Sequence, residues 1–135
     1  MKWIWWMGLV IVGSLLVGCA GEADSLKLDA DSNAGKAVLA QTGILAVTLV
    51  SNPSTGYTWS VVSVDNSILV QQGDPVFAQT NQNNVVGSWG TETFRFKGMA
   101  LGKTQLVLGY RRAWQKDEVP IRTFQVEIEV VPAAK

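Results

Sequence analysis

Few residues of this chain have side chains that could carry out chemistry on another molecule. Histidine is absent from all 135 residues, which excludes histidine-based triads, histidine-ligated metals and histidine general bases. The hydroxyl groups of Ser54 and Thr55 therefore have no histidine partner to activate them. The single cysteine, Cys19, can form neither an internal disulfide nor a cysteine-cluster zinc site. Glu127 and Glu129 alternate with apolar residues, as on the solvated face of a strand. We therefore expect no enzyme activity, no metal and no cofactor.

The charge balance argues against nucleic acid as a partner. Lys and Arg together number 11, Asp and Glu together also number 11, and the net charge is zero. A nucleic-acid-binding face requires a local excess of basic side chains. The remaining candidates for function are loops that could hold a partner through shape and aromatic contacts.

The first candidate loop combines residues that stiffen a turn. Proline fixes its own φ, glycine permits a positive φ, and short polar side chains hydrogen-bond to nearby backbone. The loop contains all three kinds of residue, in the order Asn52, Pro53, Ser54, Thr55, Gly56, Tyr57. The simpler interpretation is a well-made connection between two strands, with Trp59 packed in the core.

Two further candidate loops each present a tryptophan. The second loop reads Gly87, Ser88, Trp89, Gly90, and the third contains Arg112, Ala113, Trp114. Trp and Arg are the residue types most enriched at interface hot spots, so both loops could supply binding anchors. The simpler interpretations are a glycine-permitted bend for the second loop and a cation–π pair between Trp114 and an arginine for the third.

The elements that must position these loops read as short strands. Residues 124–130 alternate strictly between apolar and polar side chains, which is the period of a half-buried strand. Similar runs occur at residues 26–28, 36–40, 44–50, 57–64, 68–71, 76–79, 93–97 and 103–110. Turn-forming residues separate these runs, and no window sustains a helical apolar stripe. The pattern predicts an all-β protein, an antiparallel β-sandwich of about seven to nine strands.

In combination, the three loops resemble those of the chagasin family of cysteine-peptidase inhibitors. That family carries an Asn-Pro-Thr-Thr-Gly-Phe/Tyr loop, a Gly-x-Gly-Gly loop and an Arg-Pro-Trp loop, in this chain order. The resemblance covers roughly residues 26–131. Ser54 keeps the hydroxyl of the family's threonine, but Trp89 stands where the family often has glycine. Ala113 replaces the family's proline, so the third loop loses a rigid φ.

The resemblance implies an immunoglobulin-like β-sandwich that inhibits papain-like cysteine peptidases reversibly and competitively. The three loops would form a wedge that enters the active-site cleft. Thr55 and Gly56 would meet the region of the catalytic cysteine, Trp89 would line one wall, and Arg112 with Trp114 would line the other. We expect a monomer. The alternative function is a non-catalytic envelope lipoprotein that binds another envelope protein or a glycan, with its exposed tryptophans stacking on sugars.

The N-terminus is typical of an export signal. Lys2 precedes an apolar run over residues 3–17, which is shorter than the roughly 20 residues of a membrane span. The run ends in Leu16-Val17-Gly18-Cys19, which resembles a bacterial lipobox. We therefore expect a signal peptide over 1–18, a lipidated tether over 19–25 that begins with Cys19, and an inhibitor domain over 26–135. An ordinary signal peptide or an uncleaved anchor is the alternative. Ala20 after the cysteine favours the outer membrane, with the domain facing the periplasm.

Overall fold

Nine strands and two short 3-10 helices account for most of the backbone that the structure describes. The computed structural model describes residues 25–79, 89–115 and 117–133. The elements are β1 (Ser25–Leu28), η1 (Ala30–Ser32), β2 (Gly35–Ala40), β3 (Ile44–Ser51), η2 (Pro53–Thr55), β4 (Tyr57–Ser63), β5 (Leu69–Gln71), β6 (Val76–Gln79), β7 (Gly90–Gly98), β8 (Gly102–Arg112) and β9 (Arg122–Val131). Each run that was expected to be extended is a strand, so the predicted all-β class is confirmed. No helix within the described ranges has both the length and the apolar character needed to cross a bilayer.

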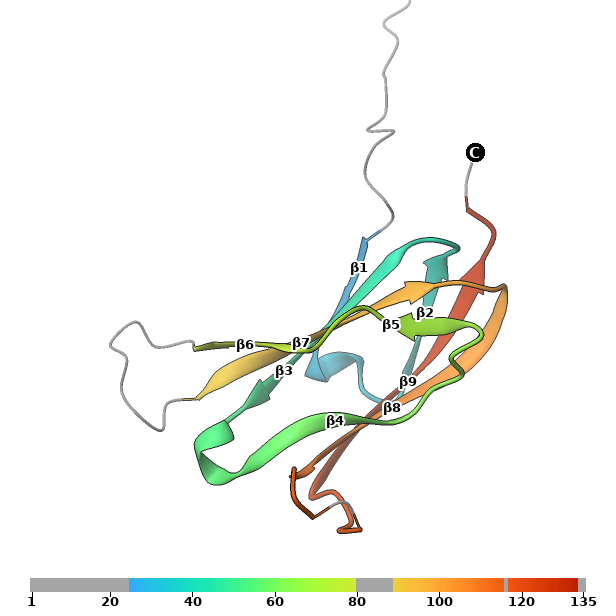
Figure 1. Cartoon of the computed structure of the whole chain (residues 1–135). Coiled ribbons are helices and arrows are strands. Elements are labelled where there is room, and N and C mark those ends of the chain that lie inside the picture. Colours follow the sequence, from blue (N-terminus) through green and yellow to red (C-terminus); the bar gives the residue numbers. More distant parts are fainter. Residues whose placement is uncertain (1–24, 80–88, 116, 134–135) are drawn as a thin grey trace, which may run out of the picture.

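The strands form two sheets that pack as a sandwich (Figure 1). One sheet has the order β1-β3-β7-β5, with β6 also paired to β7, and the other has the order β2-β9-β8-β4. Both sheets are mixed, because β1 runs parallel to β3 and β2 runs parallel to β9. The sequence predicted antiparallel pairing throughout. That prediction is wrong for these two pairs and correct for the other pairs of described strands. Alternation shows which face of a strand is buried, but it carries no information on the direction of the neighbouring strand.

The core lies between the two sheets and follows the predicted alternation. In β9 the inward positions are Phe124, Val126, Ile128 and Val130, each at most 2% exposed. Side chains of this kind contribute roughly 1.5–3 kcal/mol each when fully buried. Glu127 projects to the other face of β9, where it meets the Lys36 ammonium group at 3.6 Å on the surface. The expectation that the glutamates of this strand face solvent is therefore correct for Glu127.

The strand register brings the three candidate loops to one end of the sandwich. Ser51, the last residue of β3, lies opposite Gly90, the first residue of β7. Tyr57, the first residue of β4, lies opposite Arg112, the last residue of β8. β1 starts at the other end, because Ser25 lies opposite the first residue of β3. Figure 1 shows η2 and the β8–β9 connection at the end away from the start of β1.

Candidate functional site

The first loop is a single tight turn of 3-10 helix. The Thr55 amide donates to the Asn52 carbonyl at 3.1 Å, and the Gly56 amide donates to the Pro53 carbonyl at 2.9 Å. Proline suits the first helical position, where an amide hydrogen would have no partner. Gly56 ends the turn with φ 85° and ψ −9°, in the left-handed region. From the sequence, glycine permits a positive φ in this loop, and Gly56 adopts one.

Side-chain hydrogen bonds hold this turn in one shape. The Thr55 hydroxyl donates to the Asn52 carbonyl at 2.7 Å, and the Ser54 hydroxyl donates to the Asn52 side-chain oxygen at 2.5 Å. The Asn52 amide in turn donates to the buried hydroxyl of Tyr110 at 3.0 Å. The loop is therefore anchored to β8 and stiffened from within, which lowers the entropy that it would lose on binding a partner.

A buried carboxylate fixes the strand that leaves the first loop. Glu92 of β7 is only 5% exposed. Its two oxygens accept from the Thr58 hydroxyl at 2.6 Å and from the Trp59 amide at 2.9 Å. Trp59 is 7% exposed and its indole nitrogen donates to the Val50 carbonyl at 3.0 Å, so its expected place in the core is confirmed.

Sequence reasoning missed Glu92, although a signal was present. The residue occupies the same alternating face of its strand as Phe94 and Phe96, both of which are buried. An acidic residue in phase with two core aromatics must find hydrogen-bond donors inside the protein.

The third loop lies directly against the first. A Cβ atom built on Gly56 would collide with the indole ring of Trp114, whose Cζ3 atom would be 3.0 Å away. Trp114 is nevertheless 67% exposed, so its other face is open to a partner. Arg112 lies over the ring of Tyr57, with its guanidinium carbon 5.1 Å from the ring centroid. The cation–π pair of this loop therefore involves Tyr57, and not Trp114 as the simpler interpretation supposed. Ala113 is exposed between them.

The second loop is described only in part. Gly87 and Ser88 lie outside the described residues. Trp89 is 50% exposed beside the start of β7. Gly90 begins β7, and a Cβ atom there would collide with the Ala78 carbonyl and the Phe77 ring. Glycine at position 90 is thus explained by the close approach of β6.

The arrangement of the described loop residues supports binding to a partner. Trp89 and Trp114 are both exposed, Trp114 is braced by the first loop, and Arg112 lies over the ring of Tyr57. Within the described part of the chain, no group of acidic or cysteine side chains could hold a metal ion. Rigid backbone and exposed aromatic surface are the features expected of a preorganised protein-binding surface.

Comparisons with known proteins agree with this description. The family model of the chagasin family of peptidase inhibitors, I42, matches residues 39–128. Amoebiasin-2 of Entamoeba histolytica is 28% identical over 87 residues, which cover 64% of this chain and 70% of that protein. The solution structure of Amebosin is 28% identical, with a TM-score of 0.64 over 82% of this chain and 100% of the other.

Two other solved structures share the fold at lower identity. The crystal structure of the cysteine protease inhibitor EhICP2 from Entamoeba histolytica matches with a TM-score of 0.71 at 20% identity, over 82% of this chain and 98% of that one. PbICP-C, solved in complex with falcipain-2, matches with a TM-score of 0.53 at 18% identity, over 81% of this chain and 100% of that one. The family match includes the first and third loops with the strands that carry them. This chain therefore belongs to the chagasin family, whose members are peptidase inhibitors and not enzymes.

Proposed function

We propose that this protein is a reversible, competitive inhibitor of papain-like cysteine peptidases that blocks the active-site cleft with its three loops. The observation that carries the proposal is the contact between Trp114 and Gly56. It joins the first and third loops into one preorganised surface, as a wedge requires. EhICP2, which is a cysteine protease inhibitor, and PbICP-C, which was solved in complex with falcipain-2, support cysteine peptidases as the target class.

Each loop would have a separate task in the complex. Thr55 and Gly56 lie at the tip of the first loop and would approach the catalytic cysteine of the peptidase. Trp89 would line one wall of the cleft. Arg112 and Trp114 would line the other wall, where a desolvated aromatic anchor contributes most to affinity. Because the loops are rigid, we expect the peptidase to leave the inhibitor uncleaved.

Steady-state inhibition of papain tests this function. We expect the apparent inhibition constant to rise linearly with substrate concentration, as competition requires, and activity to return on dilution. Mass spectrometry of the recovered inhibitor should show an uncleaved chain. Absence of inhibition at micromolar protein would refute the proposal. The alternative partner, another envelope protein or a glycan, is not favoured by the family membership.

We also propose that the protein is a monomeric lipoprotein of the bacterial cell envelope, anchored through Cys19 in the outer membrane and facing the periplasm. The signal peptide, Cys19 and the tether up to residue 24 lie outside the described residues. The lipobox-like sequence supports the proposal. The geometry is compatible with it, because a tether joined to Ser25 would leave from the end opposite the loops. Metabolic labelling with a fatty acid should label the wild-type protein and not Cys19→Ser. Equal label on both would overturn the assignment.

A further inference from the structure

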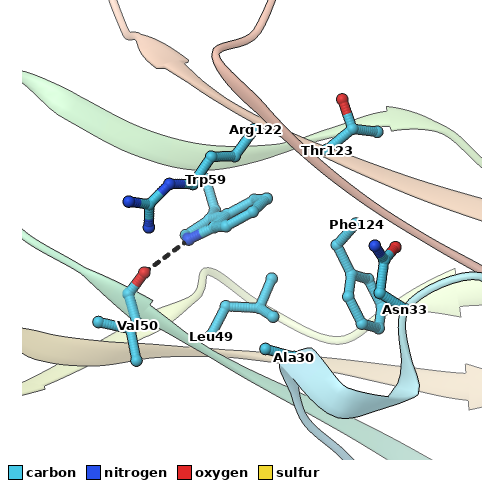
Figure 2. A pocket seen from close by; sticks show the side chains of 8 residues that line it. All are labelled: Ala30, Asn33, Leu49, Val50, Trp59, Arg122, Thr123 and Phe124. Atoms are coloured by element: carbon cyan, nitrogen blue, oxygen red, sulfur yellow. Dashed lines mark hydrogen bonds between the residues drawn. The ribbon is translucent and has the colours of Figure 1, made fainter.

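The tip of the hairpin between β7 and β8 exposes apolar side chains between two lysines. Its sequence is Lys97-Gly98-Met99-Ala100-Leu101-Gly102-Lys103. Trp59 is packed in the core, and its indole nitrogen donates to the Val50 carbonyl, as Figure 2 shows. Met99, by contrast, is 48% exposed and Leu101 is 52% exposed. About half of the surface of each of these two tip residues is thus open to a partner.

Hydrogen bonds from neighbouring connections hold this tip in place. The Met99 amide donates to the Ile68 carbonyl at 2.7 Å, and the Met99 carbonyl accepts from the Gln41 side chain at 2.9 Å. At the end of β7, the Gly98 amide donates to the Gly43 carbonyl at 3.0 Å. A supported tip would lose little conformational entropy when it meets a surface.

The tip lies at the end of the sandwich where the N-terminal segment joins the domain. Ile44, the first residue of β3, lies opposite both Ser25 of β1 and Lys97 of β7. β7 ends one residue later, at Gly98. Figure 1 shows the β7–β8 connection on the side of the domain away from η2. The chain before Ser25 therefore attaches at the same end as the tip, opposite the inhibitory loops.

Basic side chains surround the tip. Lys27 of β1 and Arg95 of β7 lie in one row across the sheet and share its outer face with Lys97. The described strands of this sheet present no acidic side chain on that face. Lys103 flanks the tip in the other sheet, where it lies opposite Glu129. Within the described residues, none of these four cations forms a salt bridge. The end therefore combines exposed apolar side chains with a local excess of positive charge.

We propose that this end of the domain docks on an anionic lipid bilayer. Met99 and Leu101 would insert at the level of the headgroups, and Lys97 would contact lipid phosphate groups. The proposal rests on the proposed lipid anchor, which would bring this end to the bilayer. Apolar side chains flanked by lysine are typical of protein segments that lie in the membrane interface, and anionic lipid attracts basic side chains. In this orientation the three inhibitory loops would point away from the bilayer.

Hydroxyl-radical footprinting of the full chain on vesicles tests the proposal. Oxidation of each side chain is measured by mass spectrometry on vesicles of saturated phosphatidylcholine, with and without saturated phosphatidylglycerol. We expect Met99 to be oxidised about fivefold more slowly on the anionic vesicles, which corresponds to a docked state favoured about four to one. Trp114, which is 67% exposed at the other end, should react equally on both. Salt at about 1 M should remove most of the protection, because it shortens the Debye length to about 3 Å.

Two pairs of variants show whether the tip and its charge are responsible. Leu101→Gln should reduce the protection of Met99 to below about twofold, because insertion of a half-exposed leucine is worth about a factor of five. Val119→Gln is its control, since Val119 is 81% exposed in the β8–β9 connection and should leave the protection unchanged. Lys97→Gln should also reduce the protection to below about twofold, because one basic side chain near an anionic surface contributes about a factor of five. Arg112→Gln removes the same charge at the loop end and should have no effect.

Several results would overturn the proposal. Equal oxidation of Met99 on the two kinds of vesicle would do so and would favour a protein as the partner of the tip. Equal protection of Trp114 would contradict docking through this end, and full protection in Leu101→Gln would exclude insertion of the tip. Equal loss of protection in Lys97→Gln and Arg112→Gln would indicate general charge attraction.

Fatty-acid labelling distinguishes failure of the docking from failure of the proposed anchor. A chain that takes up the label while Met99 shows no protection would refute the docking alone. A chain that takes up no label while Met99 is protected would refute the anchor alone. Papain inhibition in solution should be the same for Lys97→Gln and wild type, because Lys97 lies at the end opposite the loops.

Discussion

Replacing Gly56 by alanine separates the two reasons for a glycine at the tip of the first loop. The residue has φ 85°, and a Cβ atom there would also collide with the ring of Trp114. Gly73 provides a matched control, since it has φ 71° but nothing within 4 Å of an added Cβ atom. Both substitutions strain the backbone in the same way, and only Gly56→Ala displaces the ring.

The expected magnitudes follow from this difference. A left-handed alanine costs roughly 1–2 kcal/mol, so both variants should lose about this much free energy of unfolding. Gly56→Ala should in addition push the Trp114 indole out of its place on the first loop. A misplaced hot-spot tryptophan costs about 2 kcal/mol of binding free energy, or roughly thirtyfold in the inhibition constant.

Inhibition constants with papain and urea denaturation curves measure the two effects independently. We expect Gly56→Ala to be weaker both in stability and in inhibition, and Gly73→Ala to be weaker in stability alone. If Gly56→Ala inhibits like wild type although it is destabilised, the bracing of Trp114 by Gly56 has no role in binding. If both variants lose inhibition equally, the loss is caused by lower stability of the whole domain and not by displacement of Trp114.

Trp114→Ala should weaken papain inhibition by about 2 kcal/mol, roughly thirtyfold, with little change in melting temperature because the ring is mostly exposed. Thr55→Ala should cost less, about 1 kcal/mol of loop stability, since it removes a neutral hydrogen bond to the Asn52 carbonyl and a long one from the Tyr57 amide, and the inhibition constant should rise less than for Trp114→Ala. Glu92→Ala should lower the free energy of unfolding by about 3 kcal/mol in urea, because the buried carboxylate accepts two hydrogen bonds. Hydrogen bonds from the Ser67 side chain and amide lower the pKa of Asp65, so this group stabilises the fold above its ordinary pKa and the contribution is lost as the pH falls. Ser67→Ala should raise that pKa in an NMR titration, and an unchanged value would contradict the assignment.

The strands could be predicted because each depends on a local pattern. Residues such as Phe124, Val126 and Ile128 alternate with polar neighbours, and burial on one face of a sandwich requires this spacing. The loop positions followed from the gaps between the strands. The positive φ of Gly56 could be predicted as well, since few other residues adopt that conformation.

Other features depend on contacts between distant residues and could not be predicted. Nothing in the composition of β2 indicates that it runs parallel to β9. The hydrogen bonds of Glu92 join β7 to β4, and the contact of Trp114 with Gly56 joins two loops. Such pairings are set by the packing of the whole domain, and a short window of sequence does not show which distant residues come into contact.

The central place of the last strand in its sheet bears on how the nascent chain folds. β9 lies between β2 and β8. Gly35 of β2 pairs with Val126 of β9, so β2 cannot join its sheet until β9 has been synthesised. Strands so far apart in the sequence pair slowly, because the chain loses the entropy of loop closure before the contacts between the strands stabilise the pairing. Ribosomes add about 5–20 residues per second, so β2 stays without its partner until synthesis is nearly complete. The four-stranded sheet, and with it the core between the two sheets, is therefore completed only at the end of synthesis, although every strand of the other sheet has been made by Gly98.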